Sequence, residues 1–150
     1  MSGGRLTSKL VLGSNTNYQI SGSGESNHDI KQIIYGRASL HSVKVHNTQA
    51  NAITLDFYDN GETITKDASG NTVKTNDLVD TGSAYTITLG KLIHRCEVGT
   101  GTNNFDFDFH GAMLEKGLLV VMYASPTAAD GANPGTSRTK VGIGVSAQYN

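Results

Sequence analysis

The sequence predicts an all-β domain, an antiparallel β-sandwich or jelly roll of about 8–10 short strands with little or no helix. Gly, Thr, Ser and Asn supply 59 of the 150 residues, and these types favour turns and strands. Glutamate, a strong helix former, occurs only four times. Apolar residues alternate in runs of strand length, and turn signals separate the runs.

The clearest strand covers residues 52–58, where Ile53, Leu55 and Phe57 share one face. Asn60-Gly61 follows it and predicts a hairpin into a strand over 62–66. A turn over 67–71 then leads to a strand over 72–75. The remaining strands are expected at 6–12, 18–20, 30–35, 40–45, 85–89, 92–98, 105–110, 117–123 and 141–149.

Four segments depart from simple alternation. The spacing of Leu40 and Val43 predicts a β-bulge. The run 117–123 is apolar on both faces, so it is expected to be a central strand covered on both sides. Residues 112–116 are expected to form one helical turn at most, and residues 125–138 a long exposed loop. The residues predicted to form the core are Leu55, Phe57, Phe107, Leu119, Val121 and Ile143.

The length predicts one sandwich domain over residues 30–150, preceded by an N-terminal arm or edge strands over residues 1–29. The net charge of −1 argues against a nucleic-acid partner, and the absence of a long apolar run argues against a membrane partner. Charge is unevenly distributed along the sequence: residues 1–50 carry a net charge of +3 and residues 51–124 a net charge of −5. The basic first third is therefore suited to an acidic partner surface.

Two groups of acidic residues are candidate metal sites. Asp106, Asp108 and His110 alternate, so on a strand they would point to one side and offer ligands to a divalent ion. The same alternation places polar residues in solvent and phenylalanines in the core, and this second interpretation is favoured. Asp56, Asp59 and Glu62 form another acidic group but lack the calcium-loop spacing.

Cys96 is the only cysteine, which excludes an intrachain disulfide and a cysteine-based zinc site. It was weighed as a nucleophile, but a core thiol is favoured because Leu92, His94 and Val98 share its predicted face. His94 is expected to be a hydrogen-bonded core or interface histidine. Residues 142–147 match G-x-G-x-x-A, but in a strand rather than at a helix start. No catalytic, cofactor-binding or metal-binding residue is predicted, no cofactor is expected, and the protein is not expected to be an enzyme.

Four segments resemble a pattern shared by small virion proteins of tailed bacteriophages. The segments are Leu40-His41-Ser42-Val43-Lys44-Val45, Ala52-Ile53-Thr54-Leu55-Asp56-Phe57-Tyr58-Asp59, Gly117-Leu118-Leu119-Val120 and Val141-Gly142-Ile143-Gly144-Val145. The resemblance covers about residues 30–149. It implies a β-sandwich of the head decoration or cement type, which binds the major capsid protein or another virion protein. It also implies residence in the virion, after assembly in the cytoplasm of the bacterial host.

Self-association is also expected. The resemblance implies a homotrimer on a symmetric lattice, and a dimer is the next choice. Two other functions stay open: a carbohydrate-binding or adhesive β-sandwich, such as a tail- or fibre-associated domain, and a small hydrolase or metal enzyme of jelly-roll type. The lack of Trp argues against the first, and the lack of a His-x-His pair argues against the second.

Overall fold

The computed structural model describes residues 5–13, 18–20, 28–48, 53–61, 64–66, 71–74, 85–87, 89–99, 103–123 and 143–150. These residues form twelve strands: β1 (Thr7–Leu12), β2 (Tyr18–Ile20), β3 (His28–Tyr35), β4 (Ala38–Asn47), β5 (Ile53–Asp59), β6 (Ile64–Lys66), β7 (Thr72–Lys74), β8 (Tyr85–Ile87), β9 (Lys91–Val98), β10 (Asn103–Leu114), β11 (Gly117–Tyr123) and β12 (Ile143–Tyr149). The described part of the chain has no helix, and hence none long and apolar enough to cross a membrane.

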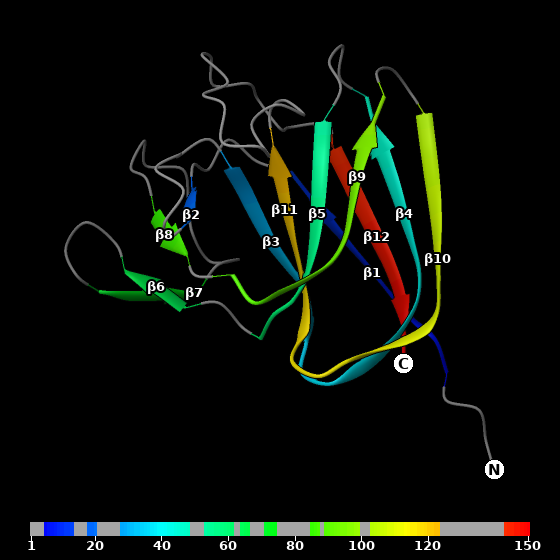
Figure 1. The fold of residues 1–150 in the computed structure, drawn as a ribbon, viewed down its shortest axis with the longest axis horizontal. Coiled ribbons are helices and arrows are strands. Elements are labelled where there is room, and N and C mark those ends of the chain that lie inside the picture. Colours follow the sequence, from blue (N-terminus) through cyan, green and yellow to red (C-terminus); the bar gives the residue numbers. More distant parts are fainter. Residues whose placement is uncertain are drawn as a thin grey trace.

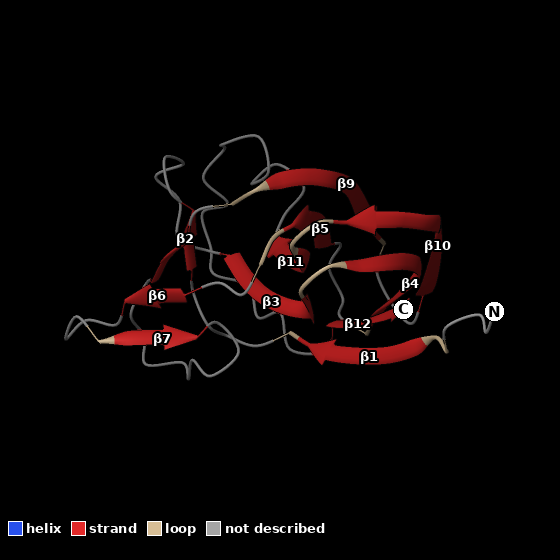
Figure 2. Ribbon diagram, turned by 90° about the horizontal axis from the view of Figure 1, so that it is seen from below, coloured by secondary structure: helices blue, strands red, loops and turns tan. Residues whose placement is uncertain are grey.

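The long strands form two packed antiparallel sheets, as the sequence predicts. One sheet has the order β1-β12-β4-β10, and the other contains β3-β11-β5-β9 and is extended past β3 by the short strands β2 and β8. Counted along the chain, the eight long strands take the orders 1-8-3-6 and 2-7-4-5. This is the double-sheet arrangement of a jelly roll. Figure 2 shows the two layers end-on, with β1 at the margin of its layer.

The first 29 residues contribute strands to this sandwich. β1 lies at the edge of the four-stranded sheet and pairs with β12 from Thr7↔Tyr149 to Leu12↔Gly144. β2 joins β3 through Tyr18↔His28. Figure 1 shows β1 alongside β12, and the β6–β7 hairpin set apart from the long strands. The arm predicted for the rest of residues 1–29, and the loop predicted for 125–138, lie outside the described residues.

The predicted bulge in β4 is confirmed. β12 pairs with β4 through Gln148↔Ser42 and Tyr149↔Leu40, so His41 is the extra residue. The insertion shifts the side-chain alternation by one position, and both Leu40 and Val43 are thereby fully buried.

The hairpin predicted at Asn60-Gly61 is wrong. β5 pairs with β11 on one side and β9 on the other, whereas β6 pairs only with β7 among the described strands. Both edges of β5 are therefore already occupied by strands from distant parts of the sequence. Residues 112–116 form no helical turn, which agrees with the predicted limit of one turn at most, because β10 continues as a strand to Leu114.

The core between the sheets is built from the residues that alternation placed on one face. Leu55, Phe57 and Ile143 are fully buried in it. Phe107 is only partly buried and packs at the margin of this core. Leu119 and Val121 are also fully buried, but they point to the opposite face of β11 from Leu118, Val120 and Met122, which belong to the core cluster. The prediction of a central strand covered on both faces is confirmed.

Asp59 stabilises the turn between β10 and β11. Its carboxylate accepts hydrogen bonds from the backbone N–H groups of Glu115, Lys116 and Gly117, at 2.9, 2.9 and 3.3 Å. Gly117 has φ +141°, and a Cβ there would lie 2.3 Å from the Ile34 carbonyl oxygen, so the turn requires glycine. Burial raises the pKa of Asp59, but the hydrogen bonds from the three N–H groups and the charge of Lys116 together lower it by more. The pKa of Asp59 is therefore below the ordinary aspartate value of 3.8.

We expect Asp59→Ala to lower the free energy of unfolding at pH 7 by about 1–3 kcal/mol, because three N–H groups lose a charged acceptor. A carboxyl group with a lowered pKa stabilises the fold above the unfolded-state pKa and loses this effect as pH falls through the folded-state value. The difference from wild type should therefore shrink below about pH 4. Urea unfolding at pH 7 and pH 3 measures both effects. The matched control is Asp106→Ala, which removes an exposed aspartate; an equal loss in the two variants would contradict the role of Asp59.

Candidate functional site

The face of β9 that carries Cys96 differs from the predicted one. β5 pairs with β9 through Phe57↔His94 and Tyr58↔Leu92, so Ile93 is a bulged residue. Ile93 packs against the core in place of Leu92, which is 42% exposed. His94, Cys96 and Val98 keep the inward face that the sequence predicted.

His94 lies in an aromatic cluster at the margin of the sandwich where β9 and β10 face each other. Its ring centroid lies 5.2 Å from that of Phe107, 5.7 Å from Phe109 and 6.3 Å from Phe57. The Nε2 atom is buried and has no hydrogen-bond partner in the described structure, so the expected hydrogen bond is absent at this atom. The described neighbours of His94 pack against it as aromatic rings, and none of them donates or accepts a hydrogen bond at Nε2.

Cys96 is arranged as a core thiol. Burial raises the pKa of Cys96 to about 12, and the negative charge of Asp56 adds to the rise. Because the thiolate is the nucleophile, a pKa this high suppresses nucleophilic chemistry near neutral pH. Cys96 and His94 therefore lie on one face without forming an activated pair.

We expect Cys96 in the folded protein to react with iodoacetamide at pH 8 about 1,000-fold more slowly than an exposed cysteine, because its thiolate population is smaller by about that factor. Mass spectrometry of alkylated protein over time measures the rate. The control is the same protein in denaturing urea, where the thiol should react at the ordinary rate. Equal rates in the two conditions would contradict the buried, protonated state.

The acidic face of β10 is exposed and is not assembled as a metal site. Asp106 lies 3.9 Å from the Lys44 ammonium group, so its nearest charged neighbour is a cation. Asp108 accepts a hydrogen bond from the His110 backbone N–H at 2.8 Å. His110 has φ +52° and falls in an irregularity of the β10–β4 ladder, so the alternation through Asp106 and Asp108 is broken there. Within the described ranges, no group of three His, Cys, Asp or Glu side chains could hold an ion.

The second acidic group is also dispersed. Asp56 is fully buried on the outer face of β5 and forms a two-point ion pair with Arg95, at 2.6 Å from Nε and 2.9 Å from Nη2. Asp59 caps the turn described above, and the side chain of Glu62 lies outside the described residues. Ile143–Ala147, from the G-x-G-x-x-A match, lie in strand β12 as expected.

The two sheets differ in their outer faces. On the larger sheet, outward side chains of β5 and β11 are buried, including Asp56, Tyr58, Leu119 and Val121. On the four-stranded sheet, the outward side chains of Lys44, Asp106 and Asp108 are exposed. The outer face of the four-stranded sheet is therefore the open sheet face of the described molecule.

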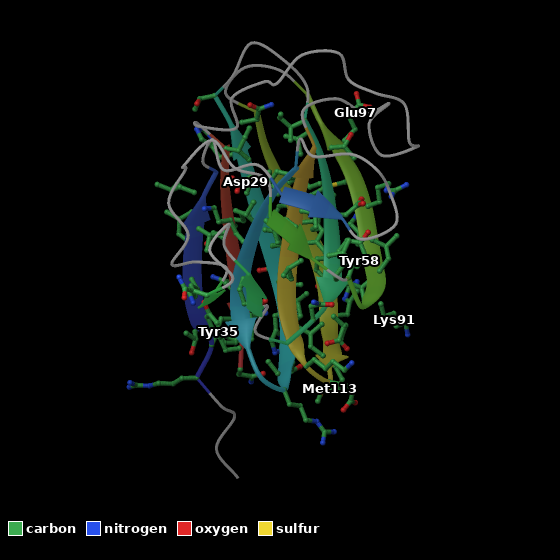
Figure 3. The ribbon with its side chains drawn as sticks, turned by 90° about the vertical axis from the view of Figure 1, so that its left-hand side faces the viewer. Asp29, Tyr35, Tyr58, Lys91, Glu97 and Met113 are labelled. Atoms are coloured by element: carbon green, nitrogen blue, oxygen red, sulfur yellow. The ribbon has the colours of Figure 1, made fainter. Side chains whose placement is uncertain are left out.

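An apolar strip borders this open face along β1. Leu10 and Leu12 are 60% and 63% exposed, and Leu6, just before β1, is 50% exposed. Leu10 and Leu12 lie over Gly144 of β12, which has no side chain to cover them. β1 is the terminal strand in the order β1-β12-β4-β10, so its side away from β12 pairs with no other described strand. Figure 3 shows β1 at the side of the sandwich, away from β9 with its labelled residues Lys91 and Glu97.

We call Arg5–Leu12 the β1 edge. Sequence reasoning identified its positive charge and the option of an edge strand, but not its leucines. The signal was available, since Leu10 and Leu12 alternate with Lys9 and Val11 in a strand-length run. Alternation alone assigns such leucines to a core face, and only the position of β1 at the sheet margin leaves them exposed.

The fold and the site together define a jelly-roll sandwich with one open outer face, bordered by the apolar edge strand β1, which pairs with β12 alone among the described strands. Among the described residues, no group of three possible metal ligands is assembled, although Asp108 Oδ2 lies 3.4 Å from His110 Nδ1. No protein-family model, no curated protein and no solved structure matches the chain.

Proposed function

We propose that the protein is a non-enzymatic structural protein of a tailed-phage virion that binds and stabilises the capsid surface, as a head decoration protein does. The resemblance in the sequence supports this proposal. The described residues of its four segments lie in β4, β5, β11 and β12, which are long strands of the sandwich. Jelly rolls are also common among viral capsid domains, which supports the proposal by analogy of fold.

The observation that carries the proposal is the exposed β1 edge. Leu10 and Leu12 on the edge strand β1, and Leu6 just before it, are each at least half exposed, which is unusual on a surface that contacts only water. They are suited to a surface that is covered in an assembly. The major capsid protein or another virion protein is the proposed partner.

Self-association is part of the proposal, with a trimer as the expected state and a dimer next. The half-buried aromatic margin between β9 and β10 supports it, because Phe107 and Phe109 are only partly covered within one chain. Light scattering at micromolar concentration measures the state, and a monomer would contradict this part of the proposal.

Binding to heads tests the main proposal. Purified protein is mixed with tailed-phage heads assembled without it, and the heads are sedimented. We expect saturable co-sedimentation and a rise in the temperature at which the heads release DNA. Absence of co-sedimentation would contradict the proposal. Binding on a glycan array without binding to heads would favour the adhesive or carbohydrate-binding alternative.

A further inference from the structure

We infer that the β1 edge binds an extended segment of a partner protein as an added strand, and that this segment alternates acidic and apolar side chains. This inference rests on the proposed function only for the identity of the partner as a virion protein. The binding mode itself follows from the backbone, the side chains and the charges of β1.

The backbone of β1 presents hydrogen-bonding groups on the side that pairs with none of the described strands, called its free side below. The Gly13 N–H donates to the Ile143 carbonyl oxygen at 2.9 Å, so residues in phase with Gly13 point their N–H and C=O groups toward β12. In an antiparallel ladder, the residues between them point these groups the other way. Ser8, Leu10 and Leu12 therefore direct their N–H and C=O groups to the unpaired side, where an extended peptide can bond to them.

β1 presents leucine side chains on its outer face and the Lys9 side chain on its inner face. Leu10 is paired with Ser146 and, like Leu12, lies on the open outer face. Lys9 is paired with Ala147, a core residue, and so lies on the inner face, where its ammonium group sits 4.5 Å from the Tyr35 ring centroid. An added strand would place one set of its side chains beside the leucines and the alternate set beside Lys9.

Charge identifies the added strand as one with acidic residues. The β1 edge carries Arg5 and Lys9 and no acidic residue. A second copy of the same strand would bring these cations together, and like charges across a strand pair are destabilising. A lysine on an edge strand is a known device against such self-pairing. The same lysine favours a partner strand whose acidic side chains alternate with apolar ones.

Two peptide probes test the inference on the full chain. One is an acetylated heptapeptide of alternating Val and Glu, and the other has Lys in place of Glu. We expect fluorescence anisotropy to show tighter binding of the Glu peptide, by at least about tenfold. The variant Lys9→Glu should reverse this preference. Equal binding of the two peptides to wild type, or an unchanged preference in Lys9→Glu, would overturn the inference.

A proline substitution tests the backbone bonds directly. Leu10→Pro removes an N–H group that faces the free side and no ladder bond to β12, so the fold should be kept. We expect it to weaken binding of the Glu peptide by at least about tenfold, whereas Leu10→Ala keeps the N–H and should weaken it less. A Glu peptide N-methylated at its Val residues, whose N–H groups would face those of Leu10 and its neighbours, checks the same bonds without altering the protein and should not bind. Full binding by Leu10→Pro in its folded state, or by the methylated peptide, would overturn the inference.

The outcomes separate this inference from the proposed function. If Leu10→Pro binds heads as wild type does, the β1 inference fails and the proposed function stands. If wild type binds the Glu peptide but not heads, the proposed function fails and the β1 inference stands. If wild type forms a dimer that Leu10→Pro abolishes, the occupant is a second copy of the chain, and the acidic partner strand is rejected.

Discussion

Replacing Phe57 with alanine is expected to lower the free energy of unfolding by about 3–5 kcal/mol. The Phe57 side chain is fully buried in the core, and its ring lies near rings of both sheets, with Phe109 at 6.2 Å and His94 at 6.3 Å between centroids. Truncation removes the buried apolar surface and leaves a cavity that the closely packed strands cannot refill. Urea unfolding followed by circular dichroism measures the loss.

The matched control is Phe107→Ala. Phe107 has the same side chain but is only partly buried, at the margin of the core. Truncating Phe107 should still lower the melting temperature, but by less than truncating Phe57 does. Less buried apolar surface is lost at Phe107, and water can enter the vacated space. An unchanged melting temperature for Phe107→Ala would contradict the inward register of β10. Equal losses in the two variants would contradict the difference in burial between Phe57 and Phe107.

Replacing Arg95 with methionine is expected to lower the free energy of unfolding by about 3 kcal/mol. The Asp56 carboxylate is fully buried, and the Arg95 guanidinium group binds both of its oxygens. The Arg95 side chain itself is 41% exposed, so solvent screens part of the attraction, and the expected loss lies at the lower end for a broken buried pair. Urea unfolding at pH 7 provides the measurement.

Two controls isolate the buried charge as the cause. The double variant Asp56→Leu with Arg95→Met removes both charges and should recover much of the loss, because no unpaired carboxylate remains in the interior. Lys44→Met breaks the exposed pair with Asp106 at 3.9 Å and should cost less than about 1 kcal/mol. If the double variant were no more stable than Arg95→Met, the loss would come from packing and not from the buried charge.

The open face and the β1 edge bring the functional proposals together. On the larger sheet the outward side chains of β5 and β11 are buried while those of β9 are exposed, whereas the outer face of the four-stranded sheet is open along β4 and β10. A protein that docks by the face of the four-stranded sheet leaves the larger sheet unchanged by binding. The head-binding and peptide experiments therefore examine the same side of the molecule at two levels, the whole surface and one strand.

Local patterns in the sequence determined which segments are strands and which side chains face the interior. In β5, alternation alone placed Leu55 and Phe57 together on the core face, where both are fully buried. The doubly apolar run of β11 predicted a central strand, and β11 lies between β3 and β5. These features follow from the side-chain period of two in a β-strand. That period depends only on residues close together in the sequence.

Only the tertiary structure decided which strands pair and which surfaces remain open. Asn60-Gly61 has the residues of a tight hairpin, yet β5 pairs with β9 and β11, because these long-range ladders bury its whole length. The bulge at Ile93 turned Leu92 outward, and the partners of Asp56 and Asp59 come from β9 and from the β10–β11 turn. The leucines of β1 became a candidate docking site only because β1 ended at a sheet margin. Pairing and edge position depend on contacts between residues far apart in the sequence, and a local period carries no information about them.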